Sequence, residues 1–247
     1  MKIISRNLLI LAISLALCFS LVSVNNCYAT TVKILSITNI YDSAYQGNSF
    51  KLPSTVIAKM SNKTTKKISV KWSSTSVNTN TLGLYKYSGT VKGYAKKVIL
   101  YLKVISLYLT NIKYYDEYSN CNNGLAYICL NGWSGKPFKI NGKSYSKGIG
   151  FVNHNYEEIL YIRYKLNYSY KNLEFKLGMD DSEIGNGTTG GIIIYDENDN
   201  ILYKTEKYVE TQDNPITVNV NVSSCRILKI QVLDGNHLVI ANPILTK

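Results

Sequence analysis

Histidine is scarce in this 247-residue sequence, which contains only His154 and His237. Neither histidine stands in a serine–aspartate or cysteine–asparagine motif, so the sequence shows no nucleophilic catalytic triad. Nor does any cysteine have a second cysteine or a histidine at zinc-ligand spacing. These absences exclude the commonest hydrolase and zinc-site patterns and favour a protein without an active site of its own.

The sequence has only four prolines and lacks long helical patterns. No segment keeps a helical period over three turns. Tyrosine, valine, isoleucine, threonine, serine and asparagine dominate instead, and these residues are typical of strands and turns. Short alternating runs such as KKISVKW, GGIIIYD and PITVNVNV recur between turn-forming clusters. Many short strands at close spacing predict an all-β protein built from two β-sandwich domains.

Only one long apolar run is present, from Leu8 to Val22. It follows a short basic region, and Ala29 provides a small residue before a cleavage site. This is the layout of a secretory signal peptide over residues 1–29. An uncleaved N-terminal anchor is the alternative, although the run is short for a membrane span of about 20 residues. We therefore expect a secreted protein, extracellular or associated with the cell surface, with no membrane span after signal cleavage.

Few cysteines remain once the predicted signal peptide, with Cys18 and Cys27, is removed: Cys121, Cys129 and Cys225. An extracellular compartment permits disulfides. A bond between Cys121 and Cys129 would close a short loop and contribute about 2–3 kcal/mol. Three unpaired thiols are the alternative, because the spacing of cysteines does not fix their pairing.

Acidic residues are nearly absent from residues 30–105, which contain twelve lysines and one acid, Asp42. Residues 106–247 contain 14 basic and 15 acidic residues, and a change this sharp predicts two domains. The lysines indicate either solvated turns or a surface for an acidic cell-wall polymer, whose binding would weaken as salt rises. Nucleic acid is not expected as a partner, because no recognition motif or interleaved aromatic residues accompany the charge.

Four runs in the basic segment follow one another in a recognisable order: FKLPSTVIAKMSN (Phe50–Asn62), ISVKWSS around Trp72, VNTNTLGLYKYSGTV (Val77–Val91) and KGYAKKVILYLKV (Lys92–Val104). Through these runs, residues 30–105 resemble a bacterial Ig-like domain of group 4. The resemblance implies a β-sandwich that serves as a spacer or adhesive module. Alternation places Trp72 with Ile68 and Val70 on the apolar face, so its ring is expected between the sheets; a sugar-binding tryptophan is the alternative.

The second segment contains another ordered set of runs: YLTNIKYY (Tyr108–Tyr115), FKINGKSYSKGIG (Phe138–Gly150), LEFKLGMDDSEIGNGTTGGIIIYDENDNILYKT (Leu173–Thr205) and HLVIANPIL (His237–Leu245). Through these runs, residues 106–247 resemble the NPCBM family of carbohydrate-binding domains, which are close kin of the family-51 carbohydrate-binding modules. The resemblance implies a galactose-binding-like jelly-roll sandwich that recognises galactose-type or other terminal sugars on glycans. Related modules often carry a structural calcium.

The sequence departs from the family pattern at several positions. The closing run keeps the histidine of the family's His-Ala-Asp-Trp-Ala-Asp motif as His237, but it differs at Val239, Ile240 and Asn242. Leu125 stands where the family often has tryptophan, and His154 lies two residues beyond the usual histidine after Gly-Ile-Gly. The departures leave the expected fold intact and weaken the expectation of galactose-type specificity.

The run LGMDDSEIGNGTTGG joins two predicted strands and contains three acids, Asp180, Asp181 and Glu183. Glycoside hydrolysis needs two carboxylates that face one bond, whereas adjacent residues at a strand end point to opposite faces. We therefore expect no catalytic pair. Three readings stay open: a calcium site formed by Asp180 and Asp181, a turn in which the acids accept hydrogen bonds from backbone N–H groups, and direct contact with sugar.

Sugar recognition needs planar hydrogen-bonding groups for hydroxyls and an aromatic face for C–H groups. The candidate residues of these types are Tyr114, Tyr115, Trp133, His154, Asp180, Glu183, His237 and Asn242. His237 is the first choice, because it stands where the family motif has histidine. The sequence thus predicts a secreted, non-catalytic glycan-binding protein. A cell-envelope structural or protein-interaction module that has lost sugar binding is the alternative.

Overall fold

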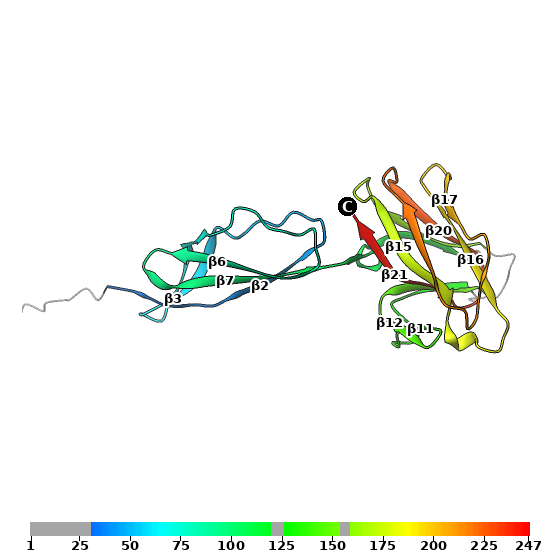
Figure 1. Cartoon of the computed structure of the whole chain (residues 1–247), viewed down its shortest axis with the longest axis horizontal. Helices are drawn as coiled ribbons and strands as arrows, with labels where there is room; N and C mark the ends of the chain where they lie inside the picture. The colour runs from blue at the N-terminus through cyan, green and yellow to red at the C-terminus, as the bar shows by residue number, and fades with distance from the viewer. Residues whose placement is uncertain (1–30, 120–125, 154–158) are drawn as a thin grey trace, which may run out of the picture.

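The computed structural model describes residues 31–119, 126–153 and 159–247. In these residues all regular elements are strands except two short 3₁₀ helices, η1 (Leu109–Asn111) and η2 (Asp181–Glu183). Figure 1 shows two β-sandwiches joined where β7 (Tyr94–Ile105) leads into β8 (Leu107–Tyr108). The predicted all-β fold is confirmed. No helix in the described part of the chain is long and apolar enough to cross a membrane.

The first sandwich packs a three-stranded sheet, in the order β1-β3-β4, on a four-stranded sheet, in the order β2-β7-β6-β5. β2 pairs with β7 in parallel, and the other pairs are antiparallel. Besides β7, the strands are β1 (Ile34–Ile37), β2 (Ile40–Tyr45), β3 (Thr55–Met60), β4 (Thr65–Ser69), β5 (Lys71–Trp72) and β6 (Gly83–Val91).

Trp72 lies in the interior of this sandwich. Its ring packs against two clusters of buried residues, one around Leu100 and Leu102 and the other around Val56 and Val98. The indole Nε1 donates a hydrogen bond to the carbonyl oxygen of Pro53 at 2.7 Å. A satisfied indole N–H and packing on both clusters agree with the predicted structural role of Trp72.

The second sandwich consists of two six-stranded sheets and a separate hairpin, β11–β12. One sheet has the order β10-β13-β21-β15-β19 with β8 beside β21, and the other has the order β17-β16-β20-β14-β9 with β18 beside β16. Besides β8, the strands are β9 (Tyr114–Ser119), β10 (Ala126–Leu130), β11 (Phe138–Ile140), β12 (Lys143–Tyr145), β13 (Gly148–Asn153), β14 (Leu160–Lys165), β15 (Asn172–Met179), β16 (Thr189–Tyr195), β17 (Ile201–Lys204), β18 (Val209–Glu210), β19 (Ile216–Asn221), β20 (Ile227–Asp234) and β21 (Leu238–Thr246).

Alternating apolar residues of both sheets form the core of the second sandwich. β15 contributes Leu173, Phe175 and Leu177, and β20 on the opposite sheet contributes Leu228 and Ile230, all of them buried. A period of two along each strand places these side chains on the inner faces. The core holds the strand ends rigidly, so the loops that join them have fixed starting points.

The thiol of Cys225 is fully buried, and burial, followed by the nearby charges of Glu197 and Asp196, raises its pKa to about 12. Because the thiolate is the reactive form, we expect iodoacetamide to leave Cys225 unlabelled in the folded protein at mildly alkaline pH. Mass spectrometry should find it labelled after unfolding in guanidinium. Labelling in the folded protein at the rate of free cysteine would contradict the buried position.

The predicted disulfide between Cys121 and Cys129 stays a prediction, because Cys121 lies outside the described residues. Cys129 is half-buried on β10 and is not bonded to Cys225.

Candidate functional site

Two loops meet at one end of the second sandwich. One follows β15 and contains η2, and the other joins β20 to β21 and ends at His237. The backbone N–H of Asp180 donates a hydrogen bond to the carbonyl oxygen of His237 at 3.0 Å. This bond brings the acidic loop against the histidine, although the two are more than fifty residues apart in the sequence.

The carboxylates of Asp180 and Asp181 hold the β11–β12 hairpin in place. Asp180 is 4% exposed, and its carboxylate accepts hydrogen bonds from the backbone N–H groups of Lys139 at 2.9 Å and Ser182 at 3.1 Å. Asp181 accepts one from the N–H of Gly142 at 3.0 Å. Of the three readings of this loop, the geometry fits acids that bond backbone N–H groups.

The predicted calcium site at Asp180 and Asp181 stays a prediction, and this set of donors adds no support for it. Both carboxylate oxygens of Asp180 already accept N–H hydrogen bonds, and Asp181 offers one buried oxygen, Oδ1, without a hydrogen-bond partner in the described residues. Calcium takes roughly six to eight oxygen ligands. Within the described ranges, no three His, Cys, Asp or Glu side chains gather closely enough to hold a metal ion.

Glu183 and His237 form a close pair at this end of the sandwich. His237 Nδ1 lies 2.9 Å from Glu183 Oε1, and the two side chains are 21% and 8% exposed. The second carboxylate oxygen, Oε2, accepts a hydrogen bond from Asn186 Nδ2 at 3.2 Å. This contact places the imidazole of His237 directly beside the Glu183 carboxylate.

Trp133 packs edge-on against His237, with ring centroids 4.9 Å apart and an interplanar angle of 68°. Phe138 supports the tryptophan from another side, also at 4.9 Å. The rings fit because Gly150 on β13 has no side chain: an added Cβ would lie 2.4 Å from Trp133 Cη2. The half-buried indole, the imidazole and the Glu183 carboxylate thus form one cluster, which we call the Trp133–His237 cluster.

The structure places other predicted residues elsewhere. Tyr114 and Tyr115 lie on β9, an edge strand of the opposite sheet, where Lys165 Nζ is 4.8 Å from the centroid of the Tyr115 ring. Asn242 lies five residues along β21 from His237, and its N–H donates to the carbonyl of Lys147 at 2.8 Å. His154 falls outside the described residues.

Several polar groups near the cluster were not predicted from the sequence. Asn186 joins it through Glu183. Three side-chain oxygens of the same loops and the end of β20 are buried without a hydrogen-bond partner in the described residues: Thr188 Oγ1, Asp234 Oδ1 and Asn236 Oδ1. Burial raises the pKa of the Asp234 carboxyl, opposed by hydrogen bonds from Gly235 and Thr189. The run DGNH (234–237), a turn sequence directly before a strand, was the available signal.

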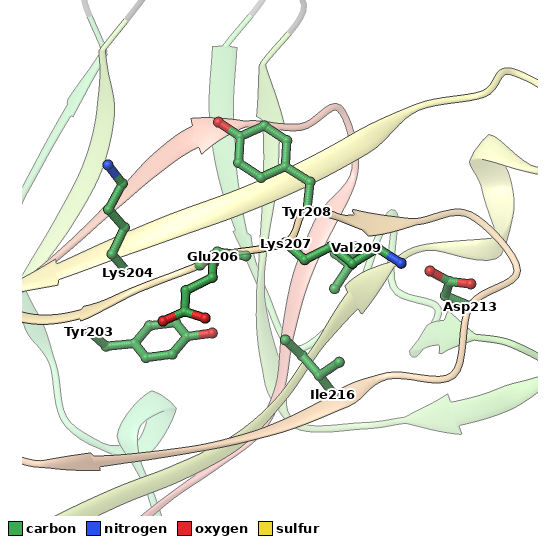
Figure 2. A pocket seen from close by; sticks show the side chains of 9 residues that line it. Tyr203, Lys204, Glu206, Lys207, Tyr208, Val209, Asp213 and Ile216 are labelled. Atoms are coloured by element: carbon green, nitrogen blue, oxygen red, sulfur yellow. The ribbon is translucent and has the colours of Figure 1, made fainter.

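A separate hollow of about 560 Å³ lies between β17 and β19, at the side of the sandwich. Figure 2 shows side chains that line it, among them those of Tyr203, Glu206, Lys207 and Asp213. None of the residues predicted from the sequence lines this hollow. It therefore does not contribute to the Trp133–His237 cluster.

The comparisons with known proteins agree with this architecture. Residues 110–242, more than half of the chain, match the NPCBM/NEW2 domain. The chain belongs to the NPCBM/NEW2 domain family. In this NPCBM protein, residues 37–94 also match the bacterial Ig-like domain of group 4. The comparison with curated proteins found no match.

Solved structures of family-51 carbohydrate-binding modules from Clostridium perfringens are similar to the NPCBM protein. The CBM51-2 and INT domains of ZmpB in complex with GlcNAc are 16% identical, with a TM-score of 0.46 over 85% of this chain and 47% of that one. The CBM51 of a GH95 protein in complex with methyl-galactose is 22% identical, with a TM-score of 0.45 over 57% of this chain and 100% of that one. The chain spans about half the length of the ZmpB structure.

Proposed function

We propose that this NPCBM protein is secreted, binds terminal sugars of glycans, of the galactose type or another, at the Trp133–His237 cluster, and catalyses no reaction on them. Membership of the family supports carbohydrate binding. The observation that carries the choice of site is the contact of an indole, an imidazole and a carboxylate at one loop end. Such a set offers both an aromatic surface and planar hydrogen-bonding groups.

The absence of catalysis is supported by what the adjacent acids do. The Asp180 and Asp181 carboxylates bond the backbone of the β11–β12 hairpin, so they do not face a common substrate bond. A second contact, between the lysine-rich first domain and acidic cell-wall polymers, would keep the protein where such glycans are displayed.

The experiment that tests the proposal is a glycan array with the chain from residue 30 onward, run with calcium and with chelator. Selective binding to one group of glycans supports the proposal. We expect chelation to leave binding unchanged, because the acidic loop is closed by N–H groups. Loss of binding on chelation would support the predicted calcium site. No binding from a folded sample would contradict the proposed function.

Replacing His237 with alanine is expected to weaken binding to the glycan selected on the array by about 10- to 100-fold. This corresponds to the loss of a partly buried polar contact worth about 1–3 kcal/mol. Isothermal titration calorimetry measures the change. Tyr115→Ala is the control, because Tyr115 lies on the opposite sheet, and it should bind as the unmodified protein does. If the His237→Ala protein and the unmodified protein bind the glycan with equal affinity, the sugar site lies outside this cluster.

One observation favours a second candidate function, a structural or protein-interaction module of the cell envelope. Val239 and Ile240, which stand where the family motif has Asp and Trp, are fully buried within β21. They offer no polar group or exposed ring to a sugar. If this second function is correct, the folded protein binds no glycan on the array.

A further inference from the structure

A groove in the first domain is lined by four lysines and by no acid. It has a volume of about 620 Å³, and its lysines are Lys33, Lys66, Lys92 and Lys96. They come from four segments: the residue before β1, β4, the turn between β6 and β7, and β7 itself. Folding thus gathers into one groove a third of the lysines that the sequence spreads over residues 30–105.

The positive charge of this lysine groove is not compensated by the protein. All four side chains are exposed. In the part of the chain that the structure describes, none of them forms a salt bridge. Asp42, the one acid of the domain, lies on β2 and does not line the groove. A concave surface with charge of one sign concentrates ligands of the opposite sign.

Beneath the lysines, the groove has an apolar floor. Ile34, Met60, Ile68 and Tyr94 line it, and three of these four side chains are only half-buried at the end of the domain core. The groove therefore suits a ligand that carries negative charges on an apolar or polyol backbone. Its volume is within the range of about 300–1,000 Å³ found for sites of small ligands, so it holds a short stretch of a polymer.

We propose that the lysine groove binds a linear polyol-phosphate polymer of the cell envelope. The choice of repeating phosphates rests on the form of the charge: the domain has twelve lysines and no arginine, so it lacks the fork that holds one carboxylate or phosphate bidentately. Lysines bind phosphate as point charges, and several of them spread along a groove match charges that repeat along a polymer. Single-stranded nucleic acid fits less well, because it needs several stacking rings, and Tyr94 is the only aromatic residue that lines the groove.

The lysine groove lies far from the Trp133–His237 cluster. Lys92 and Lys96 are at one end of β7, and the chain enters the second domain at the other end, after Ile105. Twelve residues of strand separate these ends by about 36 Å. The inference rests on the proposed attachment role in the envelope, but it does not depend on sugar binding by the second domain.

The test compares two double charge reversals in the chain from residue 30 onward, titrated with synthetic poly(glycerol phosphate) at low salt. Lys66→Glu with Lys96→Glu changes the groove. Lys86→Glu with Lys103→Glu makes the same change in net charge on exposed residues of β6 and β7 that do not line it. We expect the groove variant to bind about thirtyfold more weakly, because it loses two lysines that contact an anionic ligand. For the control variant, binding should weaken by less than about threefold.

Circular dichroism shows whether each variant is folded. The glycan titration shows whether sugar binding by the second domain is affected. The His237→Ala protein should keep full affinity for poly(glycerol phosphate), and the groove variant should keep its affinity for the glycan. Equal losses in both double variants would show a diffuse charge effect and overturn the proposal. Tighter binding of heparin or of single-stranded DNA than of poly(glycerol phosphate) would also overturn it, because the ligand would then be a sulfated glycan or a nucleic acid.

Discussion

Replacing Phe175 with alanine is expected to lower the melting temperature of the second sandwich by about 10–15 °C. The side chain is 1% exposed in the centre of β15 and meets Tyr203 edge-on at 6.4 Å between ring centroids. Removing a fully buried phenylalanine costs about 3–5 kcal/mol, because the transfer free energy is lost and a cavity remains. A domain of this size has a free energy of unfolding of roughly 5–15 kcal/mol, so a large fraction of its stability depends on this one ring.

Differential scanning calorimetry measures the effect, and Ile201→Ala is the control. Ile201 is also an apolar residue on a strand of the second sandwich, but it is 58% exposed. Its removal should cost less than about 0.5 kcal/mol. Similar melting temperatures for the two variants would contradict the described core.

Replacing Gly150 with alanine is expected to cost about 1–3 kcal/mol and to abolish glycan binding. Gly150 pairs with Cys129 on β10 and with Val239 on β21, so the backbone has a neighbour on each side. The new Cβ would lie 2.4 Å from Trp133 and 2.6 Å from Phe138. Both distances are far below van der Waals contact, and the tryptophan has to leave its place beside His237.

A double-mutant cycle tests this explanation by combining Gly150→Ala with Trp133→Ala. If the clash with the indole causes the loss, the double variant should be more stable than the sum of the two single changes predicts. Urea unfolding gives the four free energies. Additive effects, or full glycan binding by Gly150→Ala alone, would show that Trp133 does not depend on this glycine.

The strands could be predicted from the sequence because their signal is local. Alternating runs such as GGIIIYD and PITVNVNV correspond to β16 and β19, and Trp72 was placed on the apolar face from its neighbours two and four residues away. A period of two decides which side chains are buried, and it requires no knowledge of the partner strands. The order of the motifs in the second domain was enough to predict the NPCBM family.

The site could be predicted only in part, because its contacts join distant segments. His237, Glu183 and Trp133 were on the list of candidates, but their contact depends on how three loops meet. Tyr115 was an equally good candidate by residue type, and the sheet order places it on the opposite sheet. For Asp180, the reading as an acid that accepts backbone N–H hydrogen bonds fits the structure, but its long-range donor, the N–H of Lys139, lies forty-one residues away and could not be predicted.

The central claim, that glycans bind beside Trp133, is tested most directly by tryptophan fluorescence. The chain has two tryptophans, so Trp72→Phe leaves Trp133 as the only indole. On titration with the glycan selected on the array, we predict a saturable change in its emission, with the same midpoint as in calorimetry. Calorimetric binding without any change in Trp133 emission would contradict the account and move the sugar site to another part of the protein.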